Sequence, residues 1–451
     1  MIRSCRVFFL IGLLFSPGLL FAKDAATGPL ADYVHKADAS YEWAVRREGR
    51  VGTAEFAELR LVSQTWRDIA WKHQLFVIRP ASATKENHHA LLFITGGSWK
   101  DELEQPAKEE KLPREANLFA LLAEQMKTLV AVLLQVPRQP IFDGKYEDQI
   151  IAFTFEKYMQ TGDSEWPLLL PMVKSAVRGM DATTEFVAQK WKLPIETFTV
   201  TGASKRGWTT WLTGAIDSRA TAIAPIVIDV LNMAPQMKHQ KEAWGDLSYQ
   251  IKDYTDRGLT DQLQSKAGAA LRAIVDPYSY RKVLSQPKLI VIGTNDRYWP
   301  LDALNLYWKD LVGPKYILYI PNNRHGIKDL GRLTGSLNAM HQHAARNAKL
   351  PELSWEFSNG NSQLSLTIRS DMQPQKVDAW IATAKTRDFR ESKWTPRTAR
   401  REGDQFVYDL PLPDEGYAAM FGEAVYDGES LPYFLSTNVR IIGSKQAVGA
   451  E

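Results

Sequence analysis

The sequence predicts an α/β fold with a mostly parallel sheet and helices on both faces, followed by a C-terminal antiparallel β-sandwich-like domain. Up to about residue 349, continuous apolar runs alternate with amphipathic helical segments, which is typical of parallel strands buried on both faces. One stretch between two such runs is helical throughout. After residue 350 the pattern changes to short alternating segments separated by turn residues, which indicates antiparallel strands.

The first 22 residues have the features of a secretory signal peptide. Arg3 and Arg6 give a positive start, residues 7–21 are mostly apolar, and Ala22 ends a cleavage site. Cys5 is the only cysteine of the chain, so the mature protein would contain no thiol and no disulfide. We therefore expect a periplasmic or secreted protein with no transmembrane segment in the mature chain. An uncleaved membrane anchor is the alternative.

Charge and motifs exclude several classes of partner. The 55 Lys and Arg residues nearly balance the 52 Asp and Glu residues, and their scatter along the chain is typical of a solvated surface. No basic tract points to nucleic acid. The sequence contains no zinc-ligand pattern, P-loop or dinucleotide-binding fingerprint, so we expect no metal and no cofactor.

The predicted elements follow one another in a regular order. After a mixed lead-in over residues 30–51, two alternating β segments are expected at 56–63 and 69–79. Apolar runs then predict strands at residues 89–96, 128–137, 198–204, 222–230, 287–296 and 316–321. Helices are predicted at residues 117–125, 167–189 and 301–311. This alternation predicts right-handed βαβ units and therefore a parallel sheet.

The same pattern suggests a division into domains. We expect a large α/β domain over residues 23–349 and a small β domain over 350–451. Residues 231–286 are helical and rich in Trp, Tyr and Lys. Because they are inserted between two sheet strands, we expect them to form a cap over the carboxyl ends of the strands.

A serine stands at a sharp turn between a predicted strand and a predicted helix. Ser204 lies within Gly202-Ala203-Ser204-Lys205-Arg206-Gly207, where an α/β-hydrolase holds its nucleophile on a strand–turn–helix elbow. The second glycine arrives at position 207, one residue later than in the usual G-x-S-x-G pattern. An ordinary turn serine that caps the following helix is the alternative.

A base and an acid follow the serine in the order that α/β-hydrolases use. Asp296 and His325 each come directly after a predicted strand, so both should lie at the edge of the sheet that carries Ser204. Separately, Asp296 could cap a helix and His325 could be a loop histidine. Asp229 is the competing acid, and the other histidines that we considered are His88, His89, His239, His341 and His343.

An oxyanion hole needs backbone N–H groups that point at the developing negative charge. The stretch Ile94–Trp99 follows an early strand and contains two glycines. Gly97 or Ser98 would donate one N–H group, and Lys205, next to the nucleophile, would donate the other. An ordinary Gly-Gly turn is the alternative.

Large side chains beside these motifs are candidates for substrate binding. The aromatic ones are Trp99, Trp208, Tyr298 and Trp299, although aromatic residues at such places are as often core as pocket. Arg206 must point away from the strained turn, where it could pair with Asp229 or line the pocket to hold a substrate carboxylate. A salt bridge that braces the elbow is the alternative.

Three stretches, GASKRGWTTWL, IAPIVIDVLNM and GTNDRYWPLDA, resemble the PhoPQ-activated pathogenicity-related protein family. The resemblance runs from about residue 30 through the C-terminal β domain, so it covers nearly the whole mature chain. It implies an α/β-hydrolase fold and an exported location, without a defined substrate. The elbow is also similar to that of glucuronoyl esterases, from which Ala203 departs.

Together these features predict an exported serine hydrolase that cleaves carboxylic ester or peptide bonds through an acyl-enzyme. Its partners would be a small-molecule or peptide substrate and, through the β domain, cell-envelope glycan. The alternative is a hydrolase fold with a vestigial triad that acts as a binding or interaction protein of the cell envelope.

Overall fold

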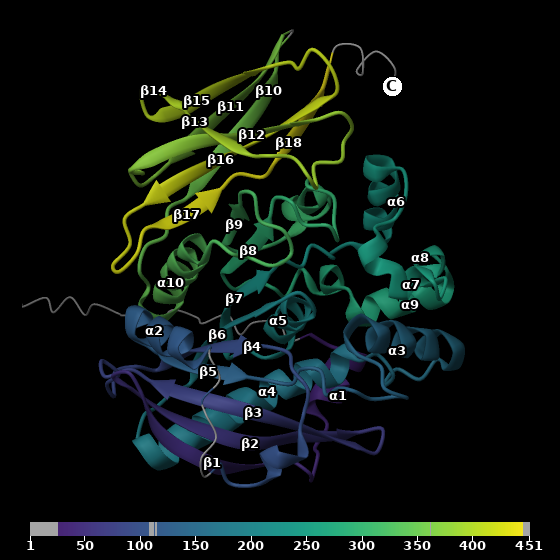
Figure 1. The fold of residues 1–451 in the computed structure, drawn as a ribbon, viewed down its shortest axis with the longest axis vertical. Helices are drawn as coiled ribbons and strands as arrows, with labels where there is room; N and C mark the ends of the chain where they lie inside the picture. Colours follow the sequence, from purple (N-terminus) through teal and green to yellow (C-terminus); the bar gives the residue numbers. More distant parts are fainter. Residues whose placement is uncertain (1–25, 108–111, 113–114, 361, 445–451) are drawn as a thin grey trace, which may run out of the picture.

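A computed structural model describes residues 26–107, 112, 115–360 and 362–444 of the chain (Figure 1). The predicted signal peptide lies outside these residues, and periplasmic or secreted localisation stays a prediction. None of the described helices combines the length and the apolar character that crossing a membrane requires.

The central sheet has the strand order β1-β2-β3-β5-β4-β6-β7-β8-β9. Its strands are β1 (Glu42–Val51), β2 (Ala54–Trp66), β3 (Ile69–Arg79), β4 (His89–Ile94), β5 (Leu129–Leu133), β6 (Thr197–Ala203), β7 (Ala220–Ile226), β8 (Lys288–Gly293) and β9 (Lys315–Ile320). The β1–β2, β2–β3 and β3–β5 pairs are antiparallel, and all later neighbours are parallel. The predicted mostly parallel sheet is confirmed.

Helices cover both faces of this sheet, as predicted (Figure 1). One face carries α1 (Pro29–His35), α4 (Leu169–Phe186) and α5 (Lys205–Ile216), and the other carries α2 (Ala116–Met126) and α10 (Leu330–Arg346). Two separate apolar clusters lie on the two sides. Every residue of β5 and β8 is therefore buried, which explains their continuous apolar runs.

Some predicted boundaries differ from the observed ones. The strand predicted over 128–137 ends at Leu133, because the chain turns at Gln135, whose φ is 57°. The helix predicted over 301–311 is instead two short 3₁₀ turns, Ala303–Leu306 and Trp308–Asp310. The lead-in resolves into α1 and β1.

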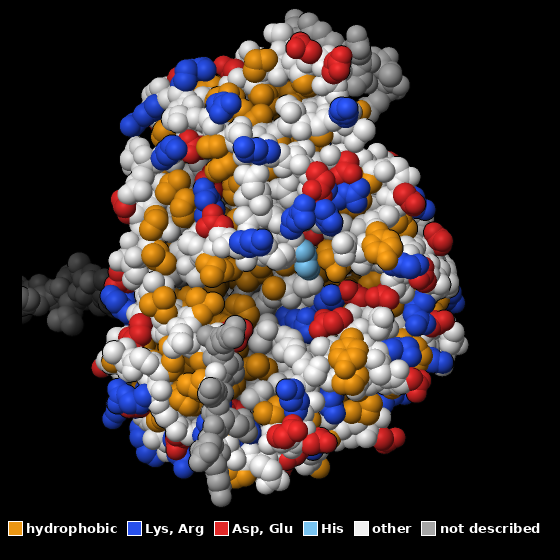
Figure 2. All heavy atoms as spheres, in the orientation of Figure 1, with side chains coloured by type: hydrophobic (Ala, Val, Ile, Leu, Met, Phe, Trp, Pro, Cys, Tyr) orange, Lys and Arg blue, Asp and Glu red, His pale blue; other side chains and the backbone are white. Residues whose placement is uncertain are grey.

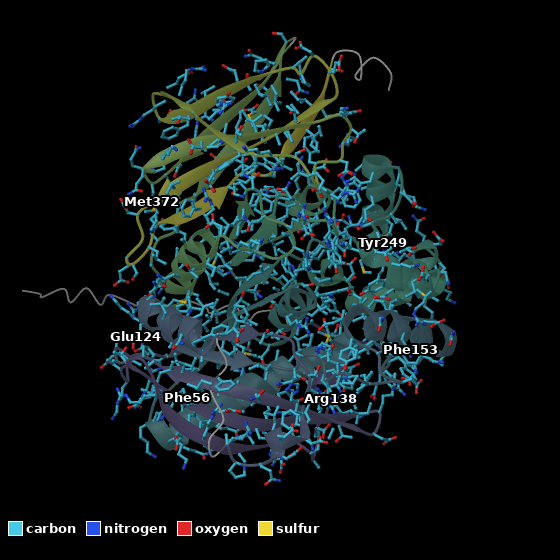
Figure 3. The ribbon with its side chains drawn as sticks, viewed as in Figure 1. Phe56, Glu124, Arg138, Phe153, Tyr249 and Met372 are labelled. Atoms are coloured by element: carbon cyan, nitrogen blue, oxygen red, sulfur yellow. The ribbon has the colours of Figure 1, made fainter. Side chains whose placement is uncertain are left out.

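The segment between β7 and β8 is helical, with α6 (Met233–Trp244), α7 (Lys252–Thr255), α8 (Leu259–Gln262) and α9 (Lys266–Val275). We call it the cap. Helices α7, α8 and α9 pack against α3 (Glu147–Thr161), beside the carboxyl ends of the strands (Figure 1). Tyr249, 78% exposed, lies on the outer side of the cap (Figure 3).

The C-terminal strands form two antiparallel layers. Their bounds are β10 (Leu353–Asn359), β11 (Gln363–Ser370), β12 (Lys376–Ala384), β13 (Thr395–Thr398), β14 (Arg400–Glu402), β15 (Gln405–Pro411), β16 (Tyr417–Tyr426), β17 (Tyr433–Ser436) and β18 (Arg440–Gly443). One layer has the order β10-β11-β15-β14, and the other has the order β17-β16-β12-β13, with β18 also paired to β16. The two layers share buried apolar side chains of β11, β12 and β16.

The second layer is joined to the central sheet, because Ser436 of β17 pairs with Ile317 of β9. The C-terminal strands therefore extend the sheet that carries the site. The division into ranges 23–349 and 350–451 stays a prediction.

Charged side chains of both signs are interspersed over the face shown in Figure 2. This matches the mixed surface that the balanced charge predicts.

Candidate active site

Ser204 lies on the strained turn between β6 and α5. Its φ of 59° and ψ of −124° belong to a region that non-glycine residues rarely adopt. The turn is held from both sides, since Ser204 N donates to Ile226 O at 2.8 Å and Trp208 N donates to Ser204 O at 3.0 Å. The side chain is thereby presented at the carboxyl edge of the sheet, as an elbow requires.

Two glycines make this turn possible. A Cβ at Gly202 would lie 2.8 Å from Arg206 Cβ, and a Cβ at Gly207 would lie 2.6 Å from Ile228 Cγ2 and 2.9 Å from Ile226 O. These separations are too short for a side chain at either position. Position 207 therefore faces the neighbouring strand and needs the glycine, whereas the side chain at position 206 turns towards Glu147 and Val136, where an arginine fits.

Ser204, His325 and Asp296 are brought together by the fold. His325 Nε2 lies 2.8 Å from Ser204 Oγ, and His325 Nδ1 lies 2.9 Å from Asp296 Oδ2. Because a carboxylate only accepts hydrogen bonds, the Nδ1 nitrogen would carry the proton and leave Nε2 free to accept from the serine hydroxyl. This is the geometry of a nucleophile, a general base and an orienting acid.

Asp296 and His325 are also fixed by Tyr298. Its backbone N donates to Asp296 Oδ1 at 2.9 Å. Its ring lies against the His325 ring, with 4.2 Å between the centroids. The aspartate side chain is 6% exposed and that of the histidine 27%. The base therefore stays reachable while its acid is shielded from water.

A loop of the C-terminal strands supports the acid from behind. We call residues 389–394, between β12 and β13, the brace loop. Asn295, directly before Asp296, donates through Nδ2 to the carbonyl oxygens of Ser392 at 2.7 Å, Arg390 at 3.2 Å and Phe389 at 3.4 Å. The brace loop thus fixes the residue next to the acid.

The same loop supports the segment that leads to the histidine. Trp394 N donates to Asn322 Oδ1 at 2.8 Å, and Asn322 Nδ2 donates to Trp394 O at 3.0 Å. Asn322 N also donates to Thr294 Oγ1 at 2.9 Å. One loop therefore contacts both segments that carry the acid and the base.

The residues predicted for an oxyanion hole have backbone N–H groups with no acceptor among the described residues. Gly97 has a φ of 119°, which favours glycine. Within the described part of the chain, nothing accepts a hydrogen bond from the N–H groups of Gly97, Ser98 or Lys205. Lys205 begins α5, whose first N–H groups have no partner within the helix. Their role stays a prediction.

Arg206 does not line the pocket and does not pair with Asp229. Its guanidinium forms two hydrogen bonds with Glu147, at 2.6 and 2.8 Å, and Nε donates to Val136 O. The arginine packs over Gly96, where an added Cβ would lie 2.3 Å from Nη2. Arg206 therefore braces the elbow against α3.

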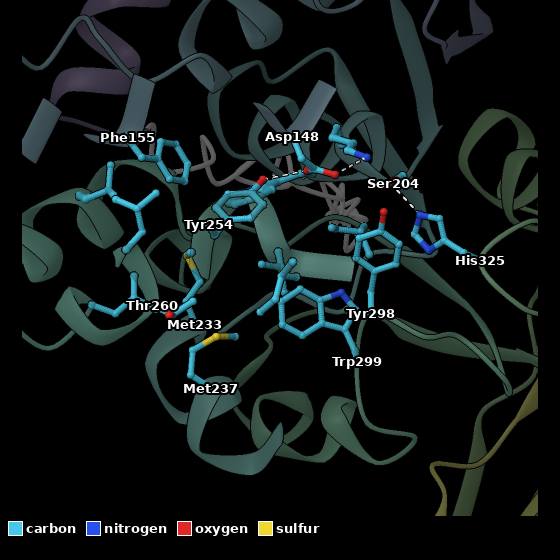
Figure 4. A pocket seen from close by; sticks show the side chains of 18 residues that line it. Asp148, Phe155, Ser204, Met233, Met237, Tyr254, Thr260, Tyr298, Trp299 and His325 are labelled. Atoms are coloured by element: carbon cyan, nitrogen blue, oxygen red, sulfur yellow. Dashed lines mark hydrogen bonds and ion pairs between the residues drawn. The ribbon is translucent and has the colours of Figure 1, made fainter. Parts of the chain in front are cut away.

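A cavity of about 60 Å³ opens beside Ser204 and His325 beneath the cap (Figure 4). Of the predicted aromatic residues, Trp208, Tyr298 and Trp299 line it, whereas Trp99 is buried elsewhere. The remaining apolar lining comes from Phe155, Ile228, Val230, Met233, Met237, Ile251, Leu259, Leu263 and Leu271. Trp99 thus belongs to the core.

A polar group stands at the mouth of this cavity. Lys205 Nζ lies 2.7 Å from Asp148 Oδ2, and Tyr254 Oη donates to Asp148 Oδ1 at 2.9 Å (Figure 4). Burial alone would lower the pKa of Lys205, but the Asp148 carboxylate raises it. Lys205 therefore faces the pocket as a paired cation.

Sequence patterns did not reveal Asp148 or Tyr254. Asp148 lies in the first turn of α3 and Tyr254 lies in the cap. Neither residue belongs to a motif, and only the packing of α3 against the cap brings them to Lys205. The sequence offered no signal for the role of Asn295 except its position next to Asp296.

The competing acid and histidines have other partners. Asp229 is buried, and burial raises its pKa to about 7; His325 contacts Asp296 instead. His239 Nε2 lies 2.6 Å from Asp302 Oδ1, and His239 does not line the cavity. His89 and His341 are buried around Thr199, and His343 Nδ1 bonds to a backbone carbonyl. His88 is exposed near Glu196.

Among the described residues, no group of three or more His, Cys, Asp or Glu side chains is arranged to hold a metal ion.

The strand order, the elbow and the cap define this chain as an α/β hydrolase by fold. It belongs to the PhoPQ-activated pathogenicity-related protein family, whose profile matches residues 30–390. A relative is autocrine proliferation repressor protein A of Dictyostelium discoideum, 31% identical over 438 residues, with 88% of this chain and 86% of that protein covered.

Solved structures with a similar fold include several esterases. Acetyl xylan esterase from Paenibacillus sp. R4 is 12% identical, with a TM-score of 0.47 over 67% of this chain and 88% of that chain. Acetyl xylan esterase 1 from Thermoanaerobacterium sp. JW/SL YS485 is 14% identical, with a TM-score of 0.46 and coverage of 70% of this chain and 91% of that chain. Glucuronoyl esterase from Solibacter usitatus is 12% identical, with a TM-score of 0.37 and coverage of 67% of this chain and 88% of that chain. These similarities concern the fold.

Proposed function

We propose that this protein is an exported serine hydrolase that cleaves carboxylic ester or peptide bonds through an acyl-enzyme. The observation that carries the proposal is the chain of two hydrogen bonds, at 2.8 and 2.9 Å, from Ser204 through His325 to Asp296. Ser204 also has the strained backbone of a nucleophile elbow.

In the first half of the reaction, Ser204 Oγ forms a bond to the substrate carbonyl carbon while its proton passes to His325 Nε2. Asp296 stabilises the imidazolium that results. The N–H groups of Lys205 and of Gly97 or Ser98 would hold the oxyanion. When the carbon–heteroatom bond breaks, the leaving group takes the proton from His325.

In the second half, water attacks the acyl-enzyme carbonyl and gives one proton to His325. The bond between Ser204 Oγ and the acyl carbon then breaks, and the serine regains its proton from Nε2. A carboxylic acid leaves, and the enzyme returns to its starting state. The ester or amide substrate and one water molecule account for all atoms of the products.

The signal peptide predicted over residues 1–22 supports the exported location. Cap residues line the cavity beside Ser204, which supports a substrate small enough to enter beneath the cap. Glycan contact through the C-terminal strands stays a separate prediction.

Fluorophosphonate labelling of the purified mature protein tests the proposal. We expect covalent labelling of the wild type, none in Ser204→Ala, and normal labelling in Ser392→Ala. Ser392 lies in the brace loop, and its hydroxyl donates to Thr383 O of β12. Absence of labelling in the folded wild type would contradict a functional triad.

The second candidate is a non-catalytic interaction protein. The relative at 31% identity is named for repressing proliferation and not for an enzymatic activity, which favours this alternative. A wild-type protein that neither labels nor hydrolyses short p-nitrophenyl esters would support it.

A further inference from the structure

The two ends of the cavity beneath the cap differ in chemistry. Ser204, His325 and the paired side chains of Lys205 and Asp148 lie at one end, whereas the far end is formed by aliphatic and sulfur-containing side chains (Figure 4). In the far part of the lining, Thr260 is the one described polar side chain. A group bound there would exchange water for an apolar surface.

We propose that this cavity binds the acyl chain of an ester substrate, so that the enzyme prefers medium-length aliphatic acyl groups. The inference rests on the proposed serine hydrolase function and adds the class of substrate. It depends on three features: the course of the cavity, its charge balance and the flexibility of its lining.

The course of the cavity separates the acyl side from the leaving-group side. His325 Nε2 must deliver its proton to the leaving group, so that group has to lie beside the histidine. The cavity runs from Ser204 away from His325, past Tyr298 and towards Met237 and Thr260 (Figure 4). A chain attached to the carbonyl carbon therefore enters the cavity, while the alcohol stays outside it.

The charge balance excludes an ionic group on that chain. Asp148 is bound by both Lys205 and Tyr254, so the cation and the anion at the mouth satisfy each other. Burying a further unpaired charge among Leu259, Leu271 and similar neighbours would be unfavourable. A hydrocarbon chain needs no such partner.

Two methionines from α6 give the cavity an adaptable wall. Met233 and Met237 are unbranched and have several rotatable bonds, so they fill irregular space around a flexible guest. Met237 is half-buried and belongs to the cap. A larger side chain at this position would shorten the space available for the chain.

The test compares p-nitrophenyl esters from acetate to dodecanoate. With the wild type, kcat/KM should rise about three-fold for each added methylene until the cavity is full. Met237→Trp should lower the ratio of octanoate to acetate turnover at least about ten-fold. The matched control is Met159→Trp, a half-buried methionine of α3 outside the cavity lining, which should keep the wild-type ratio.

Binding without turnover gives an independent measurement. In Ser204→Ala, octanoate should raise Tm more than acetate does, and adding Met237→Trp should remove the difference. A labelled, active enzyme with equal turnover of all acyl lengths would overturn this inference alone. Loss of labelling with intact octanoate binding would overturn the proposed function alone.

Discussion

The candidate active site is built from two regions with opposite chemistry. On the C-terminal side, the brace loop contacts Asn295 and Asn322 through five hydrogen bonds between 2.7 and 3.4 Å. On the cap side, most contacts around the cavity are apolar, and the polar ones are confined to the mouth at Asp148.

This difference separates two tasks. Hydrogen bonds are directional, so the polar side suits a region that must hold the acid and the base within a fraction of an ångström. Apolar contacts depend mainly on buried area and shape, so the cap suits a region that selects substrate. We therefore expect substitutions on the C-terminal side to change kcat and those on the cap side to change substrate preference.

The largest expected effect lies at the acid itself. Asp296→Asn should lower kcat about 10³- to 10⁴-fold, because the amide no longer orients His325 in the required tautomer. Steady-state hydrolysis of p-nitrophenyl acetate provides the measurement. Asp229→Asn, the substitution at the competing acid, should cost less than about ten-fold; the reverse ranking would refute the assignment of Asp296.

Asp229, the competing acid, should make stability depend on pH. Burial, together with Asp296 and Asp302, raises its pKa from 3.8 to about 7, so the folded state holds the proton more tightly than the unfolded state. Stability due to this group is full below pH 4 and is lost as the pH rises to about 7.

Chemical denaturation at pH 5 and pH 8 tests this sign. Relative to Asp229→Asn, the wild type should lose about 2–3 kcal/mol of unfolding free energy between these pH values. Equal pH dependence in the two proteins would show that Asp229 is ionised in the folded state.

A smaller effect is expected at the brace loop. Asn295→Ala removes three hydrogen bonds to the loop and should lower kcat about 10- to 100-fold with little change in KM, because the acid is displaced while the cavity is intact. The control is Asn305→Ala, which removes a comparable bond to Val439 O in the C-terminal region, at 3.0 Å.

Both asparagine variants should unfold at lower denaturant concentration, and Asn295→Ala at the lower of the two, because Asn295 is buried and Asn305 is exposed. Only Asn295→Ala should lose kcat. Equal losses of kcat would mean that the C-terminal region acts through overall stability and does not position the acid.

The smallest effect is expected at the mouth of the cavity. Tyr254→Phe removes the hydrogen bond to Asp148 but leaves the ring and the Lys205 ion pair in place. We expect KM for octanoyl esters to rise two- to five-fold, on the order of the net free energy of one hydrogen bond, at unchanged kcat. A large fall in kcat would break the division between the two regions.

The fold was accessible from sequence because its main signals are local. Strands β4 to β9 are continuous apolar runs because both of their faces are buried, and the helices between them are amphipathic because only one of their faces is buried. Boundaries were less accessible: the 128–137 run stays apolar beyond Leu133, although the chain has already left the sheet at Gln135.

For the site, the sequence by itself determined the elbow and the order of Ser204, Asp296 and His325, because each follows directly from a strand end that local pattern reveals. Tertiary structure alone decided that Arg206 turns to Glu147, that Lys205 pairs with Asp148, and that the brace loop supports Asn295. These partners are at least 57 residues apart in the chain. No local pattern encodes such pairings, because they depend on which elements pack side by side after the chain has folded.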